Sequence, residues 1–359
     1  MTGIVGYGSW IPFKRISVDE INRVWHNTSL ARVKNVLKLT ERAVLAPNED
    51  TVTIAVGAAD RALEYARIEK AQVGAAFLGT CTNPYDSRPS VTILQDALGL
   101  NGDILAGDIQ FAGKSGTTSM QVCMGLVESK MARYALAIGA DTINRHTCPG
   151  RLYEYAASAG AVALVIGTDD AIATIKATAS RCSDLSDFFR TEGERYIQDI
   201  GDGGKLYPMF EAGFTEHVVR ASQAVMDQVG LKPSDYDYAV FQQPYGAIPF
   251  VLGKRLGFSE EQIRPGVVSN QIGDCGAASV LLGLANVLDT ARAGQKILVA
   301  SYGFGAGSDA LSLETTALIE KRRSAITVAS LLSNKELVDY ATASRLEYKY
   351  AQDMSPLYL

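Results

Sequence analysis

The sequence contains the same succession of structural segments twice. In each copy an apolar strand is followed by a helix, a glycine-rich turn, a second helix and another apolar strand. The glycine-rich turns are Gly113–Gly116 in the first copy and Gly273–Gly276 in the second. The two copies are offset by about 160 residues, which indicates an internal duplication. Two such halves can pack sheet against helix pair against sheet, so that their strand ends meet at one central site.

Short runs of Val, Ile, Leu and Ala bounded by turn residues are typical of buried strands, and here they alternate with segments of helix length. The predicted strands are Val73–Thr80, Tyr134–Ala140, Ala161–Gly167, Asp237–Gln243 and Lys296–Gly303. The predicted helices are Thr51–Ile68, Ser90–Leu98, Thr117–Lys130, Glu216–Val229 and Ala277–Arg292. This alternation predicts an α/β fold with largely parallel sheets. Two independent dinucleotide-binding lobes are disfavoured, because no GxGxxG motif follows an early strand with an acidic residue in the expected place.

The length of 359 residues is enough for two fused lobes and a tail. We expect a first half over residues 1–168, a polar, glycine-rich connection over 169–215, a second half over 216–320 and a C-terminal tail over 321–359. The tail ends in an aromatic-rich stretch that includes Tyr348, Tyr350 and Tyr358. Exposed tyrosine clusters favour interfaces, so the tail is either a strap over its own chain or an arm that docks on a partner.

Charge and cysteine usage exclude several classes of function. The net charge is −5 with no basic stripe, which argues against partners that are nucleic acids or membranes. The N-terminus lacks the pattern of a signal peptide, and no apolar run reaches the ~18 residues of a membrane span, so we expect a cytoplasmic protein. The five cysteines are odd in number, widely spaced and form no CxxC pair. A disulfide framework or a metal site is therefore not expected, nor is a cofactor on this chain.

Several long strings resemble known families. Duplicated α/β halves with a glycine-rich turn in each are typical of the thiolase superfamily, whose fold has five layers in the order αβαβα. The strings "CPGRLYEYAASAGAVALVIG" and "SDFFRTEGERY" resemble archaeal-type hydroxymethylglutaryl-CoA synthase. Four further strings, "LGTCTNPYDSR", "DIQFAGKSGT", "YDYAVFQQ" and "SYGFGAGSDA", look like the synthase-like subunit of the bacterial diacetylphloroglucinol (monoacetylphloroglucinol) acetyltransferase complex.

The resemblance implies four chemical groups at the site, and this sequence departs from all four. The family's general acid or base is a Glu, its acyl-accepting nucleophile is a Cys, and a His and an Asn hydrogen-bond the thioester and its enolate. At the matching positions this chain has Cys81, Gly113, Gln242 and Asp274. The sequence therefore predicts a vestigial site with no catalytic residue. Removing a covalent nucleophile alone typically costs several orders of magnitude in rate.

Other residues could substitute for the missing nucleophile. Ser115 lies in the same turn but needs a His or Lys partner, and the side chain of its neighbour Lys114 is expected to diverge from it. The thiol of Cys81 has no evident cation beside it, and Cys275 lies at a helix start. Ser115 and Cys275 stay weak candidates for a rewired site.

The resemblance and the four departures together predict a non-catalytic subunit of a multicomponent C-acyltransferase. Such a complex transfers an acetyl group to a phloroglucinol-type aromatic carbon, a Friedel-Crafts acylation of secondary metabolite biosynthesis. The covalent chemistry is then expected on a thiolase-like partner, with zinc on a small zinc-ribbon/OB-fold subunit, and the chain itself is expected to dimerise through the thiolase-fold interface. The first alternative is a self-sufficient hydroxymethylglutaryl-CoA synthase or ketoacyl synthase III-like enzyme with a rearranged site. The second alternative is a scaffold for an unrelated complex.

Overall fold

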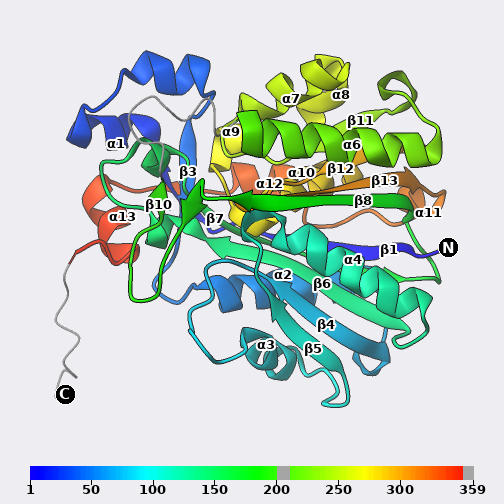
Figure 1. Ribbon diagram of the computed structural model, residues 1–359. Helices are drawn as coiled ribbons and strands as arrows, with labels where there is room; N and C mark the ends of the chain where they lie inside the picture. Colours follow the sequence, from blue (N-terminus) through cyan, green and yellow to red (C-terminus); the bar gives the residue numbers. More distant parts are fainter. Residues whose placement is uncertain (200–210, 351–359) are drawn as a thin grey trace, which may run out of the picture.

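The strands form two half-sheets that meet edge to edge (Figure 1). The structure is a computed structural model that describes residues 1–199 and 211–350. The first half-sheet contains, in order, β5 (Leu105–Ile109), β4 (Val73–Gly79), β6 (Tyr134–Thr142), β7 (Ala159–Gly167) and β1 (Gly3–Trp10). The second contains β8 (Ala173–Leu185), β13 (Gly305–Thr315), β12 (Lys296–Ala300) and β11 (Tyr238–Phe241). Strands β1 and β8 join the halves through only two residue pairs, Gly3 with Thr174 and Ile4 with Ala173.

Helices cover both faces of each half-sheet and produce five layers. Helices α4 (Ser115–Glu128) and α10 (Ser279–Leu288) form the central layer. Helices α2 (Thr51–Ala66) and α3 (Ser90–Leu98) cover the outer face of the first half, and α6 (Glu216–Val229) and α7 (Ile248–Leu256) cover that of the second (Figure 1). The predicted αβαβα fold is confirmed.

The alternation of side chains along a strand explains why the strands are apolar throughout. On β6, Ala135 and Ala137 face the central helices, whereas Leu136 and Ile138 face α2 and α3. Because successive side chains point to opposite faces, a strand covered on both sides needs a continuous apolar run. The expected strands β4, β6, β7, β11 and β12 are all present, and α3 and α6 have the predicted bounds.

The sheets are mixed rather than largely parallel. Strand β4 is parallel to β5 and β6, and β11 is parallel to β12. Strand β7 is antiparallel to β6 and to β1, and β13 is antiparallel to β12 and to β8. The antiparallel pairing follows from the connections between strands. The chain returns from β12 to β13 through a short loop, without the crossover helix that a parallel neighbour requires.

The expected connection between the halves contains a sheet strand. Strand β8 lies within residues 169–215 and pairs along its length with β13. The rest of that segment includes the short pair β9 (Phe188–Phe189) and β10 (Gln198–Asp199). The proposed domain boundaries stay a prediction, although β8 belongs in space to the second half-sheet.

The described part of the tail packs against its own chain. Its elements are α11 (Leu318–Lys321), α12 (Val328–Ser333), β14 (Glu336–Leu337) and α13 (Tyr340–Leu346). Strand β14 joins β2 (Lys14–Ser17) and β3 (Glu41–Val44) in a small sheet, and α13 lies beside α1 (Val18–Trp25). The Trp25 indole donates a hydrogen bond of 2.7 Å to the Tyr340 hydroxyl. Tyr358 falls outside the described residues.

Two short helices, α8 (Glu260–Ile263) and α9 (Ser269–Ile272), complete the second half.

Among the residues that the structure describes, no helix combines the length and the apolar character needed to cross a membrane.

Candidate active site

The four positions at which this chain departs from the resembled family lie around one cavity. Cys81 follows β4, Gly113 precedes α4, Gln242 follows β11, and Asp274 lies in the turn after α9. The cavity has a volume of about 30 Å³, room for a water molecule or two. The rest of its lining is mostly aromatic or aliphatic: Ile143, Tyr153, Phe188, Ile197, Phe214, Pro244, Gly276, Tyr302 and Phe304. The fold therefore brings the strand ends of the two halves together at one site, as the duplication predicts.

The space beside Gly113 is occupied by its neighbours. A Cβ atom added to Gly113 would lie 2.5 Å from the Tyr302 carbonyl oxygen and 2.7 Å from Nε2 of Gln242. Neither distance is compatible with a real contact, and the first involves backbone that does not yield easily. In this conformation, position 113 cannot carry a nucleophilic side chain, because Gln242 fills the volume that such a side chain would need.

The Cys81 thiol is paired with a buried carboxylate that the sequence analysis missed. Its Sγ donates to Oδ2 of Asp141 over 3.4 Å, and Oδ1 of Asp141 accepts hydrogen bonds from Thr80 and Thr82. Burial raises the pKa of the Cys81 thiol well above its usual value, and the charge of Asp141 raises it further. Because the thiolate is the nucleophilic form, Cys81 is a poor nucleophile in this arrangement.

Asp274 is the titratable group of the cavity that is best placed for acid–base chemistry. Its Oδ2 accepts a hydrogen bond of 2.7 Å from the Tyr153 hydroxyl, and its Oδ1 accepts one of 3.0 Å from the backbone N–H of Gly276. Burial raises the pKa of Asp274 to about 6. A carboxyl group with a pKa near the working pH can both take and return a proton. Tyr153 lies inside one of the strings that carried the family resemblance, which was the available signal for it.

The two weak substitutes do not line the cavity. Oγ of Ser115 accepts a hydrogen bond from the N–H of Phe111 over 2.6 Å and donates one to the carbonyl of Ala112 over 2.8 Å. Cys275 is fully buried and its thiol donates to the carbonyl of Ala159. Burial also raises the pKa of the Cys275 thiol. Both side chains are therefore held by hydrogen bonds to backbone carbonyls, that of Ser115 within its own turn and that of Cys275 across to β7.

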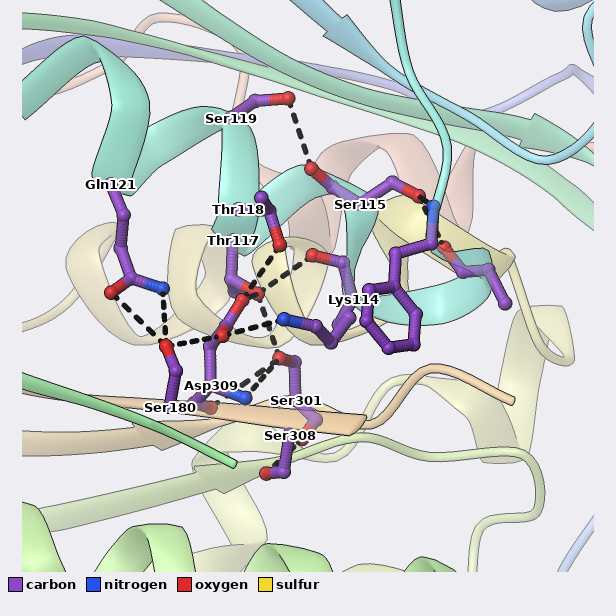
Figure 2. Close-up of polar contacts among 12 residues, drawn as sticks. Lys114, Ser115, Thr117, Thr118, Ser119, Gln121, Ser180, Ser301, Ser308 and Asp309 are labelled. Atoms are coloured by element: carbon purple, nitrogen blue, oxygen red, sulfur yellow. Dashed lines mark hydrogen bonds and ion pairs between the residues drawn. The ribbon is translucent and has the colours of Figure 1, made fainter. Parts of the chain in front are cut away.

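Lys114 also points away from the cavity. Its ammonium group lies 2.8 Å from Oδ1 of Asp309 on β13, and both side chains are buried. The hydroxyls of Thr117 and Thr118 donate to Oδ2 of Asp309, and that of Ser180 donates to Oδ1 (Figure 2). This network joins the start of α4 to the second half-sheet, so its role is to hold the halves together. The expectation that Lys114 and Ser115 diverge agrees with this geometry.

Residues 226–314 match the family model of the 3-oxoacyl-[acyl-carrier-protein] synthase III C terminal. A hydroxymethylglutaryl-CoA synthase from Methanocaldococcus jannaschii is 43% identical over 350 residues, which are 97% of this chain and 99% of the relative. The enzyme of the same name from Thermoplasma acidophilum is 41% identical over 97% of this chain and 98% of its own.

Solved structures share the fold at lower identity. MvaS in complex with 3-hydroxy-3-methylglutaryl coenzyme A has a TM-score of 0.86 and 20% identity, over 99% of this chain and 94% of its own. The 3-oxoacyl-[acyl-carrier-protein] synthase III from Aquifex aeolicus has a TM-score of 0.80 and 21% identity, and the match covers 88% of this chain and 100% of that protein's chain.

These comparisons correct the predicted function. The prediction of a non-catalytic subunit that is inactive alone is wrong, because the chain matches relatives named as enzymes over nearly their whole length. The predicted requirement for a thiolase-like catalytic partner and a small zinc-bearing subunit is overturned by the same matches. The error came from equating the loss of four family side chains with the loss of activity, although the residue at one of these positions, Asp274, is itself a titratable group. The narrower resemblance, to a subunit of an acyltransferase complex, stays a prediction.

Proposed function

Because the chain belongs to the hydroxymethylglutaryl-CoA synthase family of the thiolase superfamily, we propose that it acts by itself as a synthase of this type with a rearranged site. The observation that carries the proposal is the match at 43% identity over 97% of the chain. The name of the relatives specifies the product, whose carbon skeleton is an acetyl unit added to the ketone of an acetoacetyl unit. The balanced reaction is acetyl-CoA plus acetoacetyl-CoA plus water giving hydroxymethylglutaryl-CoA plus CoA.

The acetyl group stays attached to CoA during the condensation in this proposal. Position 113 has no room for an acyl-accepting side chain, and the side chains of Ser115 and Cys275 are held by hydrogen bonds to backbone carbonyls away from the cavity. The neutral thiol of Cys81 already donates a hydrogen bond to Asp141. A route through an acyl-enzyme therefore has no suitable carrier, whereas a thioester of CoA already has the acidified α-carbon that the condensation needs.

Asp274 moves the protons of the reaction in this proposal. Its carboxylate takes a proton from the α-carbon of the acetyl thioester, and the resulting enolate carbon forms a bond to the ketone carbon of the acetoacetyl group. The ketone π electrons move to its oxygen, and the proton held by Asp274 passes to that alkoxide to give a hydroxyl group. Water then cleaves the thioester of the acetyl unit and CoA leaves. The Tyr153 hydroxyl orients the carboxylate through its 2.7 Å hydrogen bond.

Condensation by the purified chain tests the proposal. The full chain is incubated with acetyl-CoA and acetoacetyl-CoA, and hydroxymethylglutaryl-CoA is measured by mass spectrometry. We expect product from the chain alone and a loss of at least about 100-fold in kcat for Asp274→Asn, the usual weight of a general acid–base group. The matched control is Asp289→Asn, because Asp289 also accepts a hydrogen bond of 2.7 Å from a tyrosine, Tyr7, but lies outside the cavity lining.

Two results would contradict the proposal. One is the absence of product from the isolated, folded chain that binds both thioesters. The other is an unchanged rate in Asp274→Asn. Intact-mass measurement after incubation with acetyl-CoA separates the two routes, since the proposed route leaves no acetyl adduct on the chain.

A further inference from the structure

Gln242 carries an oxygen atom that the protein leaves unused. Its side chain is 3% exposed, lines the cavity and donates from Nε2 to the Gly276 carbonyl over 3.0 Å. That bond fixes the orientation of the amide, because the flipped group would place its oxygen against the carbonyl oxygen. Among residues 1–199 and 211–350, Oε1 of Gln242 has no hydrogen-bond partner. A buried acceptor without a partner is costly, so its retention needs an explanation.

The other polar side chains of the cavity are already engaged. The Tyr302 hydroxyl donates to Oδ2 of Asp187 over 2.6 Å, the Tyr153 hydroxyl donates to Asp274, and the Cys81 thiol donates to Asp141. Asp274 in turn accepts from Tyr153 and Gly276. The acceptor left for an incoming group is therefore Oε1 of Gln242, and the ligand group that matches it is a hydrogen-bond donor.

The surroundings of Gln242 favour a hydroxyl group carried on an apolar chain. The cavity of about 30 Å³ admits a group of the size of a hydroxyl. Its walls include the rings of Phe188 and Phe304, whose centroids lie 4.3 Å apart, and the ring of Phe214, 4.6 Å from that of Tyr302. Such walls favour the carbon atoms of an acyl chain, and the low dielectric strengthens a hydrogen bond to Gln242. A charged donor such as an ammonium group is disfavoured, because its desolvation would not be repaid.

We propose that Oε1 of Gln242 accepts a hydrogen bond from a hydroxyl on the acyl chain of a bound CoA thioester, so that the cavity selects hydroxyacyl over unsubstituted acyl groups. This inference rests on the proposed function in that the ligand is a CoA thioester. The hydroxyl created by the condensation lies on the carbon that reacts, so the same acceptor can hold the product once the alkoxide has been protonated. Gln242 is then a specificity-determining residue of this chain.

Calorimetric titration of the full chain with two probes tests the inference. The probes are 3-hydroxybutyryl-CoA, taken as each enantiomer, and butyryl-CoA, which lacks only the hydroxyl group. We expect one enantiomer of the hydroxy compound to bind about tenfold more tightly than butyryl-CoA. In Gln242→Met, which keeps the length but removes the acceptor, the ratio of the two dissociation constants should fall below about twofold.

The controls separate this inference from the proposed function. Gln228→Met, an exposed position on α6, should leave the ratio unchanged. Equal binding of both probes by the unaltered chain, as expected if a water molecule is the normal partner of Oε1, would overturn the inference and leave the proposed function standing. The same holds if folded Gln242→Met keeps the tenfold preference. Failure of the unaltered chain to bind either thioester would overturn both.

Discussion

One buried ion pair should contribute substantially to holding the tail on the first half, and a substitution of Glu347 would break it. Arg42 on β3 and Glu347 after α13 are each 1% exposed and form two contacts, of which the one from Nη2 to Oε2 measures 3.1 Å. Asn144 donates to the same carboxylate over 3.1 Å, and its neighbour Ile143 lines the cavity. The ion pair thus links the C-terminal tail to a wall of the candidate site.

The magnitude follows from the burial of both charges. In Glu347→Gln the guanidinium of Arg42 stays buried without its counter-charge, which costs about 3–5 kcal/mol. The double variant Arg42→Met with Glu347→Leu removes both charges and keeps the volume, so its unfolding free energy should lie within about 1 kcal/mol of the unaltered chain or exceed it. The control is Glu260→Gln, which breaks the exposed pair with Arg264 and should cost between about 0 and 1 kcal/mol.

Urea denaturation monitored by far-UV circular dichroism and by tryptophan fluorescence measures these changes. Part of the fluorescence reports on the tail, because Trp25, one of the two tryptophans, contacts Tyr340 with ring centroids 6.2 Å apart. A cost of less than 1 kcal/mol for Glu347→Gln would refute the reasoning. So would a double variant as unstable as the single one, since that would show that packing rather than an unpaired charge determines the loss.

Four further predictions concern the cavity. The pKa of Asp274 is raised to about 6, so the folded chain holds this proton more tightly than the unfolded chain. The stability that this bound proton contributes is fully present below pH 4 and is lost as pH rises through 6, a loss of about 3 kcal/mol in all. Calorimetric melting should therefore show a smaller fall in stability over this pH range for Asp274→Asn. In the same pH range the rate of condensation should rise as the carboxylate ionises. Gly113→Ala should lower stability by about 1–3 kcal/mol in urea titrations, because its Cβ meets the Tyr302 carbonyl, and an unchanged midpoint would mean that the turn moves freely. Iodoacetamide at pH 8 should alkylate exposed Cys182 well before Cys81, whose pKa is raised by burial, and peptide mapping that finds the reverse order would contradict the neutral thiol.

The layered architecture could be predicted from the sequence because its signals are local and repeated. A strand such as β6, covered on both faces, must be apolar at every position, and this run is visible without a partner. Strand β8 escaped prediction because its second half is mostly exposed and carries polar residues. The inference from four substituted positions to an inactive subunit failed for a different reason. The identity of a residue does not reveal which neighbours in space replace its function.

The order of segments along the chain determined by itself that two half-sheets form and that their strand ends meet near Cys81, Gly113, Gln242 and Asp274. Only the tertiary structure decided how these positions interact. Tyr153 lies in a string that resembles the family, but nothing in the sequence pairs it with Asp274, its hydrogen-bond partner 121 residues away. Gln242 occupies the space next to Gly113, and Glu347 neutralises Arg42, which lies 305 residues earlier. Periodicity records how each segment is covered, whereas pairing between distant side chains depends on distances that arise only when the two halves pack together.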